Sequence, residues 1–223
     1  MGLSRSVYVM DRIHVLPSGQ GQYIREQFYP IAARKLVPPP SLCRLYFGKV
    51  LAPPDTRRIA MVNSINFPLD RARYTGLRTT MDTLPSAEDV AEGMGQMLGL
   101  VHWTAGFDGR DIEFVVGGDG YGNIQFYVID FNQVRPMSSC ASHKTQSRQQ
   151  MRRFSKPSPD IPDLVSAFFS NDPYYPRPSA SDPLYASFCS GYTTACKDYR
   201  ALGLSFLSAI EDEALSRSSA KVD

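Results

Sequence analysis

The sequence predicts one α+β domain over residues 1–223, with a small β-rich N-terminal part (residues 1–81) and a mainly helical C-terminal part (residues 82–215). Three observations support this prediction. Runs that alternate apolar and polar residues are concentrated before residue 81 and around a glycine turn near residue 120. The clearest helical stripes come after Pro85. A length of 223 residues suits one hydrophobic core better than two of comparable size.

The N-terminal part contains three predicted strands and one helix. Ser6–Leu16 alternates as a strand does and ends at a turn over 17–21. Apolar residues at helical spacing predict a helix over 22–35, with a break or kink at its proline near the end. The β-branched and aromatic runs over 42–51 and 58–67 predict two more strands. We expect these strands to form a small antiparallel sheet.

The next predicted elements are a long helix and a hairpin. Ser86 is a good N-cap and Asp89 follows three residues later, so the helix begins here and ends near His102. Its buried stripe is Val90, Met94, Met97, Leu98 and Val101. Residues 107–116 and 123–131 are then two strands joined by a glycine-rich turn.

The last third of the chain is predicted to be helical apart from one insert. Residues 138–159 are rich in Ser and Gln and contain basic residues without Asp or Glu, which is typical of a mobile basic loop or a short surface helix. Residues 163–170 are predicted to form a short helix. Asp182 caps a longer helix with Pro183 in its first turn, and we expect residues 216–223 to fray. The buried stripe of this longer helix is Leu184, Phe188, Tyr192 and Cys196.

Composition limits the classes of protein to which the chain can belong. Apolar residues make up 43%, charged residues 21%, and the formal net charge is +2, which excludes a disordered or fibrous protein. No run is apolar and long enough to cross a membrane, and the first thirty residues lack a secretory core. We therefore expect a cytoplasmic protein without a membrane partner. The four cysteines lack the CxxC spacing of a zinc site, so we expect reduced thiols and no metal.

Charge is distributed unevenly along the chain. Residues 1–81 contain twelve Lys and Arg against four acids, whereas the remainder contains twelve against eighteen. This asymmetry fits a polyanion-binding face on one part and a cation-binding face on the other. It fits two differently solvated surfaces equally well.

Five carboxylates fall close together between Phe107 and Phe131. Because like charges repel, such density indicates a cation, a proton or a cationic substrate between them. Asp111 and Glu113 would alternate on one strand face as a pair suited to a guanidinium or a divalent metal. Asp130 would stand at a strand end, where an acid could act. Asp108 and Asp119 also fit simple turn chemistry.

This region resembles the catalytic region of protein kinases and small-molecule phosphotransferases. The resemblance rests on a helix ending at His102-Trp103, then GRDIEFVV, a glycine turn and VIDF. It implies a kinase-like layout, with Asp111 as the base and Asp130 as a metal ligand. Val116 stands where that pattern has a metal-binding Asn, and the chain has no glycine-rich loop near its start.

Longer strings resemble a fungal domain family that is described only as zinc-finger-associated or of unknown function. The strings are LCRLYFGKV (42–50), NFPLDRARY (66–74), LGLVHWTAGFDGRDIEFVVGG (98–118), YVIDFNQVRP (127–136) and AFFSNDPYYPRP (167–178). Stand-alone members are similar to arginine-containing cyclodipeptide synthases. That similarity implies an aminoacyl transferase of secondary metabolism that condenses arginyl-tRNA with a second aminoacyl-tRNA into a diketopiperazine. The insert at 138–159 and Asn132, where a second acid is expected, depart from the family pattern.

The resemblance implies roles for specific residues. No cofactor is required, because aminoacyl-tRNA is already an activated ester. The expected catalytic residues are Asp111, Glu113, Asp108 and His102, although His102 also fits a buried histidine bonded to backbone. Asp130, Trp103, Tyr174 and Tyr175 would bind substrate. We expect tRNA and not DNA as the nucleic-acid partner. The expected tRNA contacts are Arg34, Lys35, Arg57, Arg58, Lys144, Arg148, Arg152 and Arg153.

Two alternatives remain open at this point. One is a metal-dependent phosphotransferase that uses Asp111 and Asp130. The other is a degenerate kinase-like module that binds a partner through the NDPYYPRP surface at 171–178.

Overall fold

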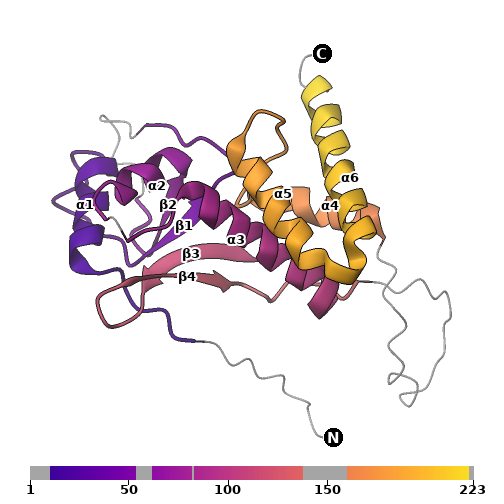
Figure 1. The fold of residues 1–223 in the computed structure, drawn as a ribbon. Helices are drawn as coiled ribbons and strands as arrows, with labels where there is room; N and C mark the ends of the chain where they lie inside the picture. The colour runs from indigo at the N-terminus through magenta and orange to yellow at the C-terminus, as the bar shows by residue number, and fades with distance from the viewer. Residues whose placement is uncertain (1–10, 54–61, 82, 138–159, 221–223) are drawn as a thin grey trace, which may run out of the picture.

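The computed structural model describes residues 11–53, 62–81, 83–137 and 160–220 (Figure 1). The predicted basic insert at 138–159 lies outside these residues, as does the first part of the predicted strand 6–16. The described chain forms a four-stranded mixed sheet and several helices, so the α+β class is confirmed.

The sheet joins the two predicted parts of the chain. Its strands are β1 (Leu42–Tyr46), β2 (Asn66–Asp70), β3 (Glu113–Gly118) and β4 (Ile124–Ile129), in the order β2-β1-β3-β4. Because β1 pairs with β3 as well as with β2, the N-terminal strands do not form a separate β-rich lobe.

The prediction of an antiparallel N-terminal sheet is wrong. β1 and β2 are parallel, with Leu42 opposite Asn66 and Tyr46 opposite Asp70. The connection between them brings the chain back to the start of β1, as a parallel pair requires. Helix α2 (Arg71–Arg78) was not predicted and follows β2 directly. The Asp70 carboxylate caps it by accepting a hydrogen bond from the backbone N–H of Arg73.

The first helix begins earlier than predicted. Helix α1 spans Ser18–Phe28, so the predicted turn at 17–21 is its first turn, and Pro30 lies just beyond its end. Of the predicted strand 6–16, the described residues contribute one bridge, between His14 and Gly118. Residues 13–16 therefore lie against the sheet without extending it as a regular strand.

Helix α3 (Ala87–Leu100) confirms the strongest local prediction. Ser86 and Asp89 form the capping box reciprocally, and the predicted stripe faces the core. The helix continues as one π-helical turn, η1 (Val101–Ala105), which Gly106 ends with a φ of +79°. The β3–β4 hairpin is antiparallel as predicted, with Glu113 opposite Ile129.

Three further helices complete the C-terminal part: α4 (Ile161–Ser170), α5 (Pro183–Cys196) and α6 (Arg200–Ser219), with a short 3₁₀ turn, η2 (Lys197–Tyr199), between the last two. Asp182 caps α5, and the four residues of its predicted stripe are buried. Residues 216–223 were predicted to fray, and this is wrong for residues 216–219. Helix α6 continues to Ser219, and Arg217 forms an ion pair with Glu213 one turn earlier.

Helices α3 and α5 lie side by side with very close backbones (Figure 1). A Cβ atom at Gly95 of α3 would collide with the carbonyl oxygen of Phe188, and one at Gly191 of α5 would collide with that of Glu92. These two glycines therefore set the distance between the helices.

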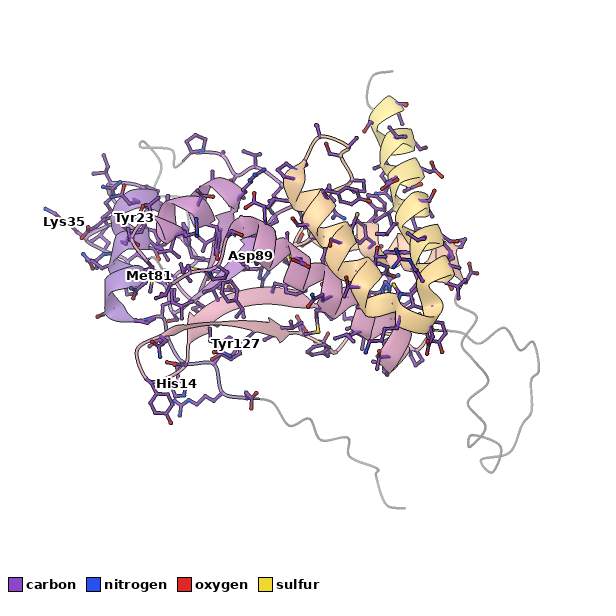
Figure 2. All side chains as sticks on the ribbon, in the orientation of Figure 1. His14, Tyr23, Lys35, Met81, Asp89 and Tyr127 are labelled. Carbon is purple, nitrogen blue, oxygen red and sulfur yellow. The ribbon has the colours of Figure 1, made fainter. Side chains whose placement is uncertain are left out.

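The two faces of the sheet differ in chemistry. Side chains alternate between faces along each strand, and the apolar face, which includes Leu45, Phe114 and Phe126, packs on α3. The opposite face carries Arg44, Glu113 and other polar groups. His14 lies near the hairpin turn, where its backbone pairs with Gly118 at the end of β3 (Figure 2).

Candidate functional site

Three carboxylates gather at the open end of the β3–β4 hairpin. Glu113 begins β3 opposite Ile129, Asp111 lies two residues earlier, and Asp130 directly follows β4. Asp111 (φ 62°) and Asp130 (φ 66°) both adopt left-handed backbone conformations. Such conformations are unfavourable for residues other than glycine and are concentrated at functional sites.

The expectation that Asp111 and Glu113 alternate along one strand is wrong. Asp111 lies in the turn before β3, and its backbone N–H donates to Oδ1 of Asn171 at 2.7 Å. Nδ2 of Asn171 donates to the carbonyl of Gly109 at 3.1 Å. Asn171, which is 5% exposed, thereby holds the turn in place from the NDPYYPRP segment. The side chain of Gln133 donates to the Asp111 carboxylate.

Glu113 is bound by groups of the protein itself. It is 6% exposed, and its Oε2 lies 2.7 Å from a guanidinium nitrogen of Arg44 on the neighbouring strand. The hydroxyl of Tyr174 donates to its Oε1 at 3.2 Å. Burial raises the pKa of Glu113, and the charges of Asp130 and Asp111 raise it further, whereas Arg44 and Tyr174 lower it.

The network continues beyond the Arg44–Glu113 pair. Arg44 donates to the hydroxyl of Tyr46 at 3.3 Å, and that hydroxyl donates to Oδ2 of Asp172 at 3.3 Å. Because Arg44 already occupies Glu113, the predicted two-carboxylate pair for a substrate guanidinium does not form from Asp111 and Glu113.

A cavity of about 990 Å³ lies along the edge strand β4 and is lined by residues of both faces of the sheet. The lining comes from Asp11 and Ile13, from all four strands of the sheet, from Met97 of α3, and from Asp130 to Asn132 after β4. Asp11, Glu113 and Asp130 contribute three carboxylates to the lining, against one guanidinium from Arg44. The lining therefore has a net charge of −2 and suits a ligand with two positive charges. We call it the acidic cavity.

Asp108 lies apart from the acidic cavity. Its Oδ1 accepts hydrogen bonds from the backbone N–H groups of Arg110 at 3.1 Å and Arg135 at 2.9 Å, and its Oδ2 lies 3.5 Å from Nε of Arg110. It lines a smaller cavity of about 220 Å³ together with Arg110, Arg135, Asp160 and Asp163. Asp108 therefore fits the turn chemistry that the sequence also allowed.

His102 and Trp103 are buried at a shared partner. Nδ1 of His102 lies 2.8 Å from the Tyr192 hydroxyl, to which Nε1 of Trp103 donates at 2.9 Å. Nε2 of His102 lies 3.3 Å from the carbonyl oxygen of Asp108. Burial lowers the pKa of His102 to about 4. His102 is therefore a buried histidine close to a backbone carbonyl, as the alternative to a catalytic role predicted. His102 and Trp103 do not line the acidic cavity.

The two tyrosines of the NDPYYPRP segment have different positions. Tyr174 is 1% exposed and contacts Glu113 from behind the cavity lining. Tyr175 is fully buried and stacks on Phe168, with Phe114 at its edge. Of the four predicted substrate-binding residues, Asp130 alone lines the acidic cavity.

Of the eight residues predicted to contact tRNA, the structure describes two, Arg34 and Lys35. Arg34 donates from Nε to the carbonyl of Tyr29, while Lys35 is exposed at the α1 end of the molecule (Figure 2). Six of these residues lie outside the described residues: Arg57, Arg58, Lys144, Arg148, Arg152 and Arg153.

Sequence reasoning missed Arg44, Asn171 and Tyr192 as organising residues. The alternation of LCRLY contained a signal for Arg44, because it places a charged residue on a strand between buried ones. Asn171 opens the unusual string NDPYYPRP but contacts a turn 60 residues earlier. Tyr192 was expected in the core, but nothing in the neighbouring sequence indicated that its hydroxyl would bind His102 and Trp103.

One family model matches the chain, over residues 126–199, and is described as a zinc finger protein of a domain family of unknown function. The match covers about a third of the chain, from within β4 to the end of η2. No curated protein and no solved structure matches the chain.

The described residues do not fit a zinc centre of the kind that this description implies. Among residues 11–53, 62–81, 83–137 and 160–220, no three His, Cys, Asp or Glu side chains are grouped so as to hold a metal ion. The described cysteines, Cys43, Cys189 and Cys196, are free, and Sγ of Cys196 donates to the carbonyl of Tyr192. Within the same ranges, no helix is both long and apolar enough to cross a lipid bilayer.

Proposed function

We propose that this protein is a tRNA-dependent cyclodipeptide synthase that takes arginine as one of its two residues. The observation that carries the proposal is the acidic cavity, whose lining has a net charge of −2. An arginyl ester at neutral pH carries two positive charges, one on its guanidinium and one on its α-ammonium group. The cavity complements both, and its volume of about 990 Å³ lies at the upper end for small-molecule sites.

The reaction needs positioning and proton transfer. The α-amine of one aminoacyl group attacks the ester carbonyl carbon of the other; an amide C–N bond forms, the ester C–O bond breaks, and the proton leaves with the tRNA 3′-oxygen. The remaining amine then attacks the second ester in the same way, which closes the diketopiperazine and releases the second tRNA. No cofactor or external energy source enters this balance.

The carboxylates divide the work in this proposal. Asp130 lines the cavity and accepts the substrate guanidinium or ammonium. Glu113 takes the proton from the attacking ammonium, and burial supports this role because it raises the pKa of Glu113 towards that of an amine. Arg44 and Tyr174 fix the orientation of Glu113. Asp111 adds negative charge to this end of the hairpin.

The partners follow from the substrates. Two aminoacyl-tRNAs bind through phosphate contacts of Lys and Arg with little sequence readout. The excess of basic residues over 1–81 supports this binding, and a cytoplasmic location supplies both tRNAs. A diketopiperazine with an arginyl side chain is a product of secondary metabolism.

The test is product analysis in bacterial cells fed isotope-labelled arginine. Cells expressing the intact chain should release a labelled cyclic dipeptide, and Asp130→Asn should reduce it at least tenfold. Asp119→Asn is the matched control, because Asp119 accepts hydrogen bonds from backbone N–H groups within the hairpin turn. Absence of any labelled cyclic dipeptide from well-expressed protein would refute the proposal.

One observation favours a second candidate, the metal-dependent phosphotransferase. Asp111 and Asp130 both have left-handed backbones at the same end of the hairpin, which parallels the base and metal-ligand positions of the kinase pattern. Titration with ATP and Mg²⁺ separates the candidates. Binding together with phosphate transfer would favour the phosphotransferase, while binding of neither nucleotide nor tRNA would leave the interaction module.

A further inference from the structure

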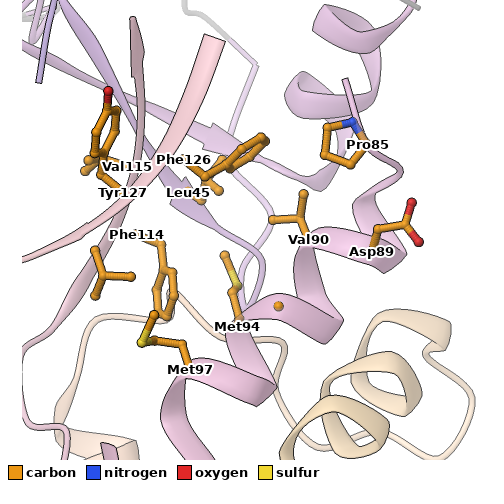
Figure 3. Close-up of a pocket in the computed structure, with 12 residues that line it drawn as sticks. Leu45, Pro85, Asp89, Val90, Met94, Met97, Phe114, Val115, Phe126 and Tyr127 are labelled. Carbon is orange, nitrogen blue, oxygen red and sulfur yellow. The ribbon is translucent and has the colours of Figure 1, made fainter. Parts of the chain in front are cut away.

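A third cavity, of about 290 Å³, lies between α3 and the apolar face of the sheet (Figure 3). Methionine, valine, leucine and phenylalanine side chains dominate its lining. Helix α3 and the residue before its cap contribute Pro85, Asp89, Val90, Gly93, Met94 and Met97, and the sheet contributes Leu45, Phe114, Val115, Phe126, Tyr127 and Val128. We call it the apolar cavity.

The apolar cavity and the acidic cavity adjoin each other. Both are lined by Met97 of α3 and by Phe126, Tyr127 and Val128 of β4. Because β4 is the edge strand of the sheet, a ligand can reach around it from one cavity to the other. A molecule whose cationic part lies near Asp130 can therefore have an apolar part next to α3.

We propose that the apolar cavity binds the side chain of the second aminoacyl group and so restricts that residue to apolar amino acids. This inference rests on the proposed function. A cyclodipeptide synthase must hold two α-amino esters within bonding distance, so the two side chains must lie in neighbouring sites. The acidic cavity suits arginine. The adjoining lining has one charged group, Asp89, whose carboxylate already accepts the backbone N–H of Ser86 in the α3 capping box. Burial of a charged side chain among the remaining apolar residues would be unfavourable.

The lining also determines which apolar side chains fit. Met94 and Met97 are flexible and polarizable, so they can adjust to aliphatic and aromatic groups. Gly93 is an exposed residue of the lining, and a Cβ atom at this position would have no neighbour within 4 Å. A larger residue at position 93 can enter the cavity without a collision of its first atom.

The first experiment is a competition in vitro. The intact protein receives labelled arginyl-tRNA and a mixture of all other aminoacyl-tRNAs, and the cyclic products are identified by mass. We expect the second residue to be apolar. Gly93→Leu should lower the ratio of large to small second residues at least about tenfold, the usual discrimination of a hydrophobic pocket, while arginine is still incorporated. Gly19→Leu is the matched control, since Gly19 is also a helical glycine with open space around it.

The outcomes separate the two proposals. No cyclic product from the intact protein refutes the proposed function. An arginine-containing product whose second residue is polar or charged refutes the apolar site and leaves the function standing. An apolar second residue whose spectrum Gly93→Leu leaves unchanged refutes the apolar site as well.

A direct binding measurement needs no activity. Methyl-labelled methionine allows NMR detection of Met94 and Met97, with Met81 and Met137 as references outside the lining. Leucine methyl ester is the probe. We expect it to shift the signals of Met94 and Met97 in the intact protein and in Gly19→Leu, and not in Gly93→Leu. Equal shifts in Gly93→Leu, or none in the intact protein, would overturn the assignment.

Discussion

The carboxylate of Glu113 and the guanidinium of Arg44 form an ion pair of 2.7 Å between two neighbouring strands, on the polar face of the sheet. The pair connects residues 69 positions apart, and both residues line the acidic cavity. The guanidinium of Arg44 therefore already pairs with Glu113, so in the proposed function Glu113 has a role other than direct charge pairing with the substrate.

Removal of either partner should destabilise the fold. We expect Arg44→Met to lower the free energy of unfolding by about 1–3 kcal/mol, less than for a fully buried pair because Arg44 is partly exposed. Glu113→Gln should have a smaller effect, because the charge that it leaves unpaired is that of Arg44, which water reaches more easily than the buried Glu113 carboxylate. Urea unfolding of both single variants and the double variant measures the coupling, and we expect the double variant to lose less than the two single losses added together. Strict additivity would contradict an energetic pairing.

Asn171 should act as a positioning residue for Asp111. Asn171→Ala removes the acceptor for the Asp111 N–H and the donor to the Gly109 carbonyl, at a loss of about 1–3 kcal/mol of stability. We expect kcat for cyclic dipeptide formation to fall about tenfold with KM little changed. Asn171→Asp keeps an acceptor for the N–H and should recover part of kcat. Asn123→Ala, in the hairpin turn, serves as the control; equal losses in both alanine variants would indicate a general effect of stability.

Stability should fall in mild acid because of His102. Burial lowers the pKa of His102 to about 4, whereas the unfolded chain binds that proton near pH 6.5. The unfolded state therefore gains a proton that the folded state does not, so stability is full above pH 6.5 and declines as the pH falls towards 4. Between pH 7 and pH 5 we expect a loss of about 2 kcal/mol. His102→Gln cannot titrate and should flatten this part of the profile in chemical denaturation; an unchanged slope would rule out His102 as its source.

Two glycines of the same helix should respond to alanine in opposite ways. Gly95→Ala places a Cβ against the backbone carbonyl of Phe188 in α5, so we expect a lower melting temperature despite the better helix propensity of alanine. Gly93→Ala adds a Cβ in open space and should stabilise the protein by about 0.5–1 kcal/mol. Thermal unfolding of the two variants compares them directly. Similar melting temperatures would mean that α3 and α5 can move apart at little energetic expense.

The elements with strong local signals were predictable from sequence. The capping box of Ser86 and Asp89 fixed the start of α3, and the glycine turn fixed the β3–β4 hairpin. The parallel pairing of β1 with β2 was not predictable, because nothing in either strand encodes the direction of its partner across the intervening residues. Helix α2 was missed because it begins directly after a strand without a turn signal.

The acids of the candidate site were found because they are dense in sequence, whereas their partners were not. Asp111, Glu113 and Asp130 fall within twenty residues, and the hairpin brings them to one end. Arg44 and Asn171 reach the same place from 69 and 60 positions away. Tertiary contacts of that separation depend on strand order and on the path of the NDPYYPRP segment.

The segment matched by the family model cannot be an independent folding unit in this chain. It contains only the last four residues of β4 and lacks β3, the strand to which β4 is hydrogen-bonded, and it contains α5 but lacks α3, against which Gly191 is packed. A peptide of residues 126–199 would expose an unpaired strand edge and an uncovered helix face, and we expect it to aggregate or remain unfolded. The recognisable part of the sequence therefore depends for its packing on β3 and α3, which lie outside the match.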